Sequence, residues 1–411
     1  MLDSAVKPLS PPPTVRMRLD YLDGLRGLAA LFVVMHHAYY GLTYEAALPP
    51  AAALLSYWLL LGRSAVDIFI VLSGYCLMLP VIRAGSGSLS GGVRKFFWRR
   101  ARRILPPYYA ALAVSLLAIA LLPALHDTSH PHALWATALP VWTLGTIVSH
   151  LLLLHNFDPA WHSKIDYPMW SVATEWQIYF LFPFLLLPLW RRFGTAALVL
   201  GAFAVGFLPL LLFPDRFSGV SPHFLGLFAL GMAAADLNFS TRPRLVFWCR
   251  TLPWGCLTTS FALILVAVSL KHTAWSLAVP FKDVLVGAAT ACLLVYCTRW
   301  LIQRHEAKGK VLETPQRAPL VLRLFESRPA VLLGIFSYSL YLIHAPVLAI
   351  CQSAVRPLHL TPIAEMLVLL GGGVPLALAV SYGFHLLFER PFLSHALVKA
   401  EQKSSGLHPQ A

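Results

Sequence analysis

Residues 18–40 read RLDYLDGLRGLAALFVVMHHAYY, and this stretch decides the fold prediction. Charged residues open it, an apolar run follows, and two histidines stand near its end. Arg26 and His37 are eleven residues apart, so a helix places both on one face, roughly 20° out of line and about 16 Å apart. His36 lies roughly 80° from that face. A cation and an imidazole on one stripe of a spanning helix mark a functional site, unless Arg26 reaches the headgroups and the histidines lie at the opposite interface.

The composition predicts an all-α fold, a polytopic bundle of transmembrane helices. Of the 411 residues, 58% are hydrophobic and 12% are charged, whereas a soluble domain carries about 25% charged residues. The net charge of +14 is therefore interpreted through its placement in loops, and no nucleic-acid partner is expected. The six cysteines form no CxxC pair, so we expect small core residues, with no metal site and no tightly bound cofactor.

Hydropathy predicts about ten spans and one further segment, Leu134–His155, that is ambiguous. If Leu134–His155 does not cross, every basic cluster falls on the cytoplasmic side, so we expect a re-entrant or interfacial segment there. The prediction is a cytoplasmic arm (1–17), a membrane domain (18–392) and a cytoplasmic tail (393–411) in the inner membrane of the cell. The expected spans lie near 19–42, 55–82, 107–124, 168–190, 194–213, 222–238, 252–270, 281–301, 331–353 and 362–388.

Two spans carry acidic residues that are candidates for a site. Glu175 lies roughly 10 Å from the outer end of its helix, and His37 roughly 8 Å from the outer end of its own. A carboxylate at that depth could orient the imidazole, or it could only bond helices together. Asp67 follows Arg63 by four residues, so an interfacial ion pair is the simpler reading there. Ser73 indicates close helix packing or room for a ligand.

Polar residues also follow one face of the segment IFSYSLYLIHAPVL. Ser337, Tyr341 and His344 stand at i, i+4 and i+7, so this stripe should face the bundle interior. Tyr338 is a further candidate in the same run. A tyrosine–histidine bond between packed helices would explain the stripe without catalysis. KFFWRRARRILPPYY (95–109) indicates either lipid headgroup contact or a phosphate-binding surface for a carrier such as coenzyme A.

Five of these motifs, in this order, resemble the acyltransferase 3 family of integral-membrane acyltransferases. They are YLDGLRGLAALFVVMHH, VDIFIVLSGY, RRARRILP, WSVATEW and SYSLYLIH, and together they cover nearly the whole apolar chain. The resemblance implies transfer of an acyl group, often acetyl, from cytoplasmic acyl-CoA as co-substrate to a hydroxyl of a carbohydrate or related acceptor. Family members often carry a C-terminal extracytoplasmic hydrolase-like domain, which we do not expect here.

The resemblance also implies roles for particular residues. By motif position, Arg26 and His37 form the catalytic pair, and Glu175 takes the acidic position. Either Arg99 with Arg102 or Arg100 with Arg103 corresponds to the basic, donor-binding motif, to which we add Ser73 as a candidate.

These observations leave three hypotheses open. The first is an O-acyltransferase in which His37 acts as general base and Glu175 orients it, with acyl-CoA, a sugar-bearing acceptor and membrane lipid as partners. The second is a proton-coupled transporter or flippase of a lipid-linked or acylated substrate, because intramembrane ionisable residues suit a carrier equally well. The third is a structural or signalling protein whose polar groups only pack helices.

Overall fold

The computed structural model describes residues 18–43, 49–85, 87–126, 139, 143–217, 219–270, 278–307 and 317–393. Every regular element in these residues is a helix, which confirms the all-α prediction. The predicted arm (1–17) and all but the first residue of the predicted tail (393–411) lie outside the described residues.

The helices differ widely in length. Those of eleven residues or more are α1 (Asp20–Thr43), α3 (Arg63–Arg83), α4 (Gly92–Leu121), α7 (Met169–Leu181), α8 (Leu187–Leu212), α10 (Phe224–Phe239), α12 (Trp254–Leu270), α13 (Ala278–Ala307), α16 (Ser337–Val355) and α18 (Val374–Phe384). The shorter α-helices are α2 (Pro50–Ser56), α6 (Leu144–Leu151), α9 (Pro214–Phe217), α11 (Pro243–Thr251), α14 (Leu320–Phe325), α15 (Arg328–Ile335) and α17 (Pro362–Val368). Short 3₁₀ or π turns join several of them: η1 (Tyr57–Leu61), η2 (Pro123–His126), η3 (His155–Phe157), η4 (Phe182–Leu186), η5 (Arg356–Leu358), η6 (Leu369–Gly373), η7 (His385–Glu389) and η8 (Arg390–Phe392).

Six helical segments of the described chain are long and apolar enough to cross a membrane, and a seventh is added if α10 and α11, bent by 96°, form one span. The count of about ten spans is therefore not confirmed. The six segments are Pro50–Arg83, Gly92–Leu121, Met169–Leu212, Val279–Glu306, Ser337–Leu358 and Pro362–Phe392.

Part of the difference in span count has a physical reason. Met169–Leu212 is 44 residues long, which is about 66 Å of helix and roughly twice the hydrocarbon thickness. Gly194 interrupts this segment with φ 83° and ψ −173°. The two spans expected at 168–190 and 194–213 meet at this break, and they are counted together as one segment. Helix α1 is not among the six, and its first turns carry three charged side chains.

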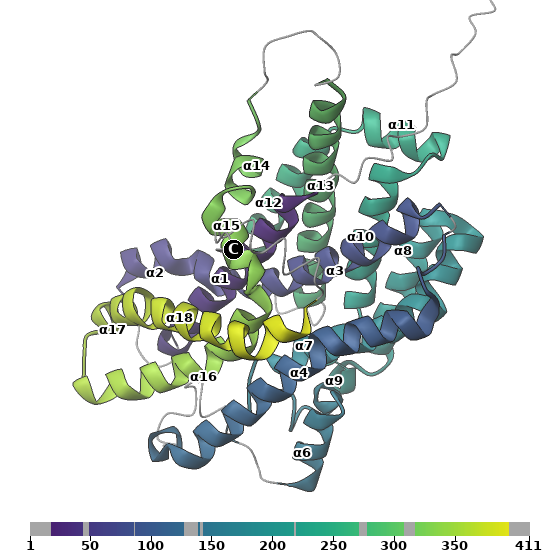
Figure 1. The fold of residues 1–411 in the computed structure, drawn as a ribbon. Helices are drawn as coiled ribbons and strands as arrows, with labels where there is room; N and C mark the ends of the chain where they lie inside the picture. The colour runs from purple at the N-terminus through teal and green to yellow at the C-terminus, as the bar shows by residue number, and fades with distance from the viewer. Residues whose placement is uncertain are drawn as a thin grey trace, which may run out of the picture.

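Helix α1 lies in the middle of the bundle and contacts α3, α15 and α16 (Figure 1). Two glycines allow the close approach of α1 to α15 and to the end of α14. A Cβ on Gly24 would overlap the carbonyl oxygen of Phe325, and one on Gly334 would overlap that of Asp23. Helices α3 and α10 cross in the same way, because a Cβ on Gly74 would overlap the Phe228 carbonyl. Small residues at helix crossings let backbones pack closely, and this packing holds α1 in place.

The described part of the ambiguous segment does not span. Helix α6 has eight residues, about 12 Å against a hydrocarbon core of about 30 Å. Its end reaches α4, where the Tyr108 hydroxyl donates to the His150 carbonyl at 3.0 Å. The turn that follows reaches α7, where the Gln177 amide donates to the Leu153 carbonyl at 3.0 Å. The chain therefore folds back among the helices here; residues 134–138 and 140–142 of the predicted segment lie outside the described residues.

Candidate functional site

The structure brings His37 of α1 and His344 of α16 together. Both imidazoles are buried, and Nδ1 of His37 lies 2.8 Å from Nε2 of His344. The other nitrogen of His344, Nδ1, lies 2.9 Å from the Leu340 carbonyl oxygen. A carbonyl only accepts, so Nδ1 of neutral His344 carries its proton and Nε2 accepts. The bond from His37 must then be donated by Nδ1–H, which leaves Nε2 of His37 with a free lone pair.

The surroundings of His37 are aromatic and nearly closed. The Tyr167 ring meets it edge-on, with centroids 5.5 Å apart, and the His36 ring lies 5.0 Å away. A cavity of about 30 Å³, room for about one water molecule, is lined by Asp166, Tyr167 and Ala345, the residue after His344. Burial raises the pKa of Asp166, and a hydrogen bond donated by a neighbouring serine opposes that rise. A buried carboxyl group thus stands one residue from the ring that covers His37.

Glu175 does not bond to His37. Its carboxylate accepts a hydrogen bond of 2.5 Å from the Tyr179 hydroxyl, and the Tyr179 hydroxyl oxygen lies 3.0 Å from the Ser73 hydroxyl. Because Tyr179 gives its proton to Glu175, Ser73 is the donor in the second bond. Within the described residues, the hydrogen-bonding partner of His37 is therefore His344 rather than Glu175. The spacing Glu175–Tyr179 is i, i+4, and could have predicted this pair.

Arg26 lies on α1 between the histidine pair and the Asp20 end of the helix. Its guanidinium contacts the Asp23 carboxylate at 3.3 Å and the Cys76 thiol at 3.7 Å. The charges of Glu175 and Asp23 both act on it. Arg26 and Glu175 thus share one electrostatic environment, on the Asp20 side of the histidine pair.

The four arginines of the basic motif on α4 divide into two pairs. Arg99 and Arg102 are exposed, and Arg99 donates to the Ser90 carbonyl at 3.3 Å. Arg100 and Arg103 are half-buried on the other face. Arg103 lies within electrostatic reach of Arg26, so only this second pair faces the interior of the bundle. Both pairs have the same spacing, and for that reason the sequence left the choice between them open.

The inward pair also faces a carboxylate that the sequence did not single out. Glu389 is buried and accepts hydrogen bonds from the Ser339 hydroxyl at 2.5 Å and from His385 at 2.9 Å. Its charge acts on Arg103. No spacing relates residue 389 to α4, so only the folded chain brings the two together.

The remaining candidates on α16 hold helices in place. The Tyr338 hydroxyl donates to the Ile104 carbonyl of α4 at 3.0 Å. The Tyr341 hydroxyl lies 2.6 Å from that of Ser171, at the start of α7. The Ser337 hydroxyl donates to the Gly334 carbonyl, in the last turn of α15. The polar stripe of α16 therefore does face the bundle interior, and its tyrosines connect α16 to α4 and α7.

Asp67 belongs to a separate polar group. Arg63 pairs with Asp283 of α13 at 3.0 Å and not with Asp67, so the simple i, i+4 ion pair is not what forms. His223 also contacts Asp283, at 2.9 Å. Asp67 is fully buried, and neither of its oxygens accepts a hydrogen bond from the described residues.

The family model of the acyltransferase 3 domain, described as "Acyltransferase domain", matches residues 19–383. The chain belongs to this family. Two curated relatives can be named. "Putative peptidoglycan O-acetyltransferase YrhL" of Bacillus subtilis strain 168 is 27% identical over 176 residues, 40% of this chain and 23% of YrhL. "O-acetyltransferase OatA" of Staphylococcus aureus strain NCTC 8325 is 24% identical over 350 residues, 82% of this chain and 51% of OatA.

The chain thus spans about a quarter to a half of the length of these relatives. No solved structure matches it. The family assignment confirms the resemblance drawn from the five motifs. Nothing in these comparisons supports the transporter alternative.

Proposed function

We propose that this acyltransferase transfers an acyl group, acetyl in the simplest case, from acyl-CoA to a hydroxyl of a carbohydrate acceptor. One observation carries the proposal: the buried rings of His37 and His344 lie within hydrogen-bonding distance, and His344 is held by the Leu340 carbonyl. The tautomers that satisfy both bonds leave the lone pair on Nε2 of His37, which has no hydrogen-bonding partner among the described residues. The relatives' names, O-acetyltransferase and peptidoglycan O-acetyltransferase, support an acetyl group and a sugar acceptor. We further propose that the enzyme lies in the inner membrane with both termini cytoplasmic.

In this mechanism His37 is the general base. Its Nε2 takes the proton of the acceptor hydroxyl while that oxygen attacks the thioester carbonyl. The C–S bond then breaks, and the CoA thiolate leaves and takes up the proton. General-base catalysis of this kind contributes about 10²–10⁴-fold. His344 positions the ring by accepting from Nδ1–H, the task that the sequence assigned to Glu175.

The donor's anionic part is assigned to the arginines that face the bundle interior. Arg26, Arg100 and Arg103 lie in one electrostatic neighbourhood, and guanidinium groups bind phosphates well. The Glu175–Tyr179–Ser73 chain lies next to this group, because the charge of Glu175 acts on Arg26. We assign it to holding the donor rather than to orienting His37.

The test is His37→Ala against His36→Ala. The His36 ring bonds to the Leu59 carbonyl at 2.7 Å and not to His344, so it is a matched control on the same helix. Purified proteins in lipid nanodiscs are given radiolabelled acetyl-CoA and β-linked N-acetylglucosamine oligosaccharides. We expect His37→Ala to lose transfer by at least about 10²-fold, while His36→Ala keeps most of it and both insert normally. Transfer at the wild-type rate by His37→Ala would refute the proposal.

A further inference from the structure

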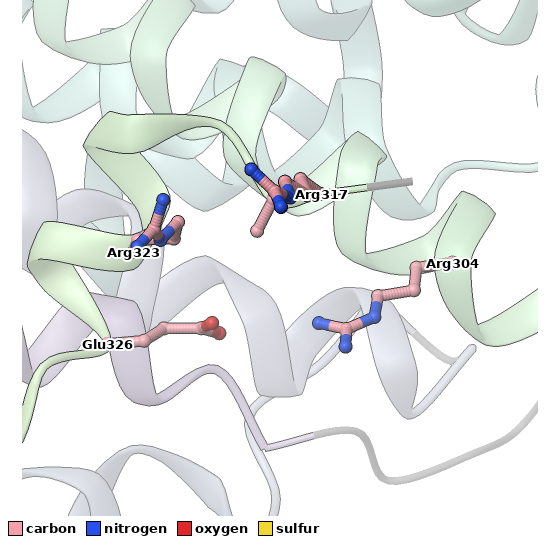
Figure 2. A pocket seen from close by; sticks show the side chains of 5 residues that line it. Arg304, Arg317, Arg323 and Glu326 are labelled. Atoms are coloured by element: carbon pink, nitrogen blue, oxygen red, sulfur yellow. The ribbon is translucent and has the colours of Figure 1, made fainter. Parts of the chain in front are cut away.

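A second site lies away from the histidine pair, where a cavity of about 680 Å³ opens between α13 and α14. That volume is within the range of about 300–1,000 Å³ typical of small-molecule sites. Figure 2 shows three guanidinium groups and one carboxylate around the same opening. They belong to Arg304 at the end of α13, Arg317 before α14, Arg323 on α14, and Glu326 just after it.

The charges in this cavity are not balanced. Three arginines against one glutamate leave an excess of two positive charges when Glu326 is ionised. Within the described residues, none of the three guanidinium groups donates a hydrogen bond or joins a salt bridge, and Arg304 only lies over the Trp300 ring at 5.3 Å. Like charges that converge on one hollow repel each other, and an anion placed between them removes that cost.

Glu326 moderates the site without neutralising it. Burial raises the pKa of Glu326, Arg304 opposes this rise, and Asp20 of α1 adds to it. Asp20 is therefore an electrostatic neighbour of the cavity. The cavity thus lies at the Asp20 end of the helix that carries Arg26 and His37, and His37 is 17 residues further on, about 25 Å along α1.

We propose that Arg304, Arg317 and Arg323 bind a phosphate-bearing ligand in this cavity. Guanidinium groups bind phosphate oxygens in paired, charge-assisted hydrogen bonds, and three unpaired ones around one hollow form such a site. Two sources share this chemistry: the nucleotide end of coenzyme A and the headgroup of an anionic phospholipid. The first source rests on the proposed function, because it makes the cavity part of the donor site; the second does not.

The experiment measures binding and not acyl transfer, so its failure is distinct from failure of the proposed function. The full chain is placed in nanodiscs of phosphatidylcholine and titrated with coenzyme A by calorimetry. In parallel, it is placed in nanodiscs containing cardiolipin, and the lipid retained after extraction is counted by native mass spectrometry. The test variant combines Arg317→Gln and Arg323→Gln. The matched control combines Arg244→Gln and Arg250→Gln, which remove the same charge from α11.

The site is supported if the test variant binds one of the two probes at least about tenfold more weakly while the control binds as wild type. Weaker binding of coenzyme A identifies the nucleotide source, and loss of retained cardiolipin identifies the lipid source. Glu326→Gln should strengthen the same binding, because it removes the opposing charge and preserves the side-chain size. If the test variant and the wild type bind both probes equally, or if the control loses as much, the proposal is wrong.

Discussion

Replacement of His344 tests the hydrogen-bond chain directly. In the structure His344 accepts the Nδ1–H of His37 at 2.8 Å and is itself held by the Leu340 carbonyl at 2.9 Å. His344→Leu removes the acceptor but keeps an apolar side chain in the fully buried position. His37 then has two ways to respond: it leaves Nδ1–H buried without a partner, or it moves the proton to Nε2 and is no longer a base.

The size of the effect follows from the first response. A buried donor without a partner costs about 1–3 kcal/mol, and about 1.4 kcal/mol corresponds to a tenfold change in rate. If this cost is what favours the productive tautomer, His344→Leu should lower kcat by roughly 5- to 150-fold. His37→Ala should lose at least as much as His344→Leu in the same assay, and at least about 10²-fold. His344→Gln should recover most of the loss, because its amide oxygen can accept from Nδ1–H.

The assay is acyl transfer by nanodisc-embedded protein, with kcat and KM measured separately for acetyl-CoA. A tautomer effect lowers kcat and leaves KM for the donor close to the wild-type value, whereas a general loss of packing would alter both. Two results would refute the reasoning. One is a kcat within twofold of wild type for His344→Leu; the other is a His344→Gln variant that folds normally and is no faster than His344→Leu.

Two further predictions concern stability. Gly231→Ala should lower the melting temperature, because its Cβ would overlap the Val71 carbonyl where α10 crosses α3. Such overpacking costs about 1–3 kcal/mol. The control is Gly371→Ala, whose Cβ meets no atom within 4 Å, and equal melting temperatures for the two variants would contradict the close crossing. The third prediction is that Asp166 makes the stability of the protein fall as pH rises. Burial raises the pKa of Asp166 in the folded protein, although the hydrogen bond from Ser115 opposes this rise. The stabilising contribution of Asp166 is therefore present below about pH 4, near its pKa in the unfolded chain, and is lost as pH rises through its higher pKa in the folded protein. Thermal unfolding between about pH 4 and about pH 8 should show this decline in the wild type and not in Asp166→Asn, and parallel profiles for the two would show that Asp166 titrates normally.

Local patterns predicted much of the site. The stripe of Arg26 and His37 could be drawn from helical spacing alone, because both residues belong to one continuous helix. The same holds for the inward polar face of α16. The partner of Glu175 was also within reach, since Tyr179 is one turn away on the same helix. Its assignment to His37 instead came from comparing depths in two helices, and equal depth does not imply that two side chains face each other.

The sequence by itself determined that this chain is a helical membrane protein of the acyltransferase 3 family and that Arg26 and His37 lie on one stripe. These conclusions depend on apolar composition, helical period and local motifs, which are properties of neighbouring residues. Only the tertiary structure decided that His344, 307 residues away, holds the ring of His37, and that Arg100 and Arg103 rather than Arg99 and Arg102 face the interior. Such choices depend on which helices pack together and on the rotation of each about its axis, and in a chain that is apolar on nearly every side no local pattern specifies them.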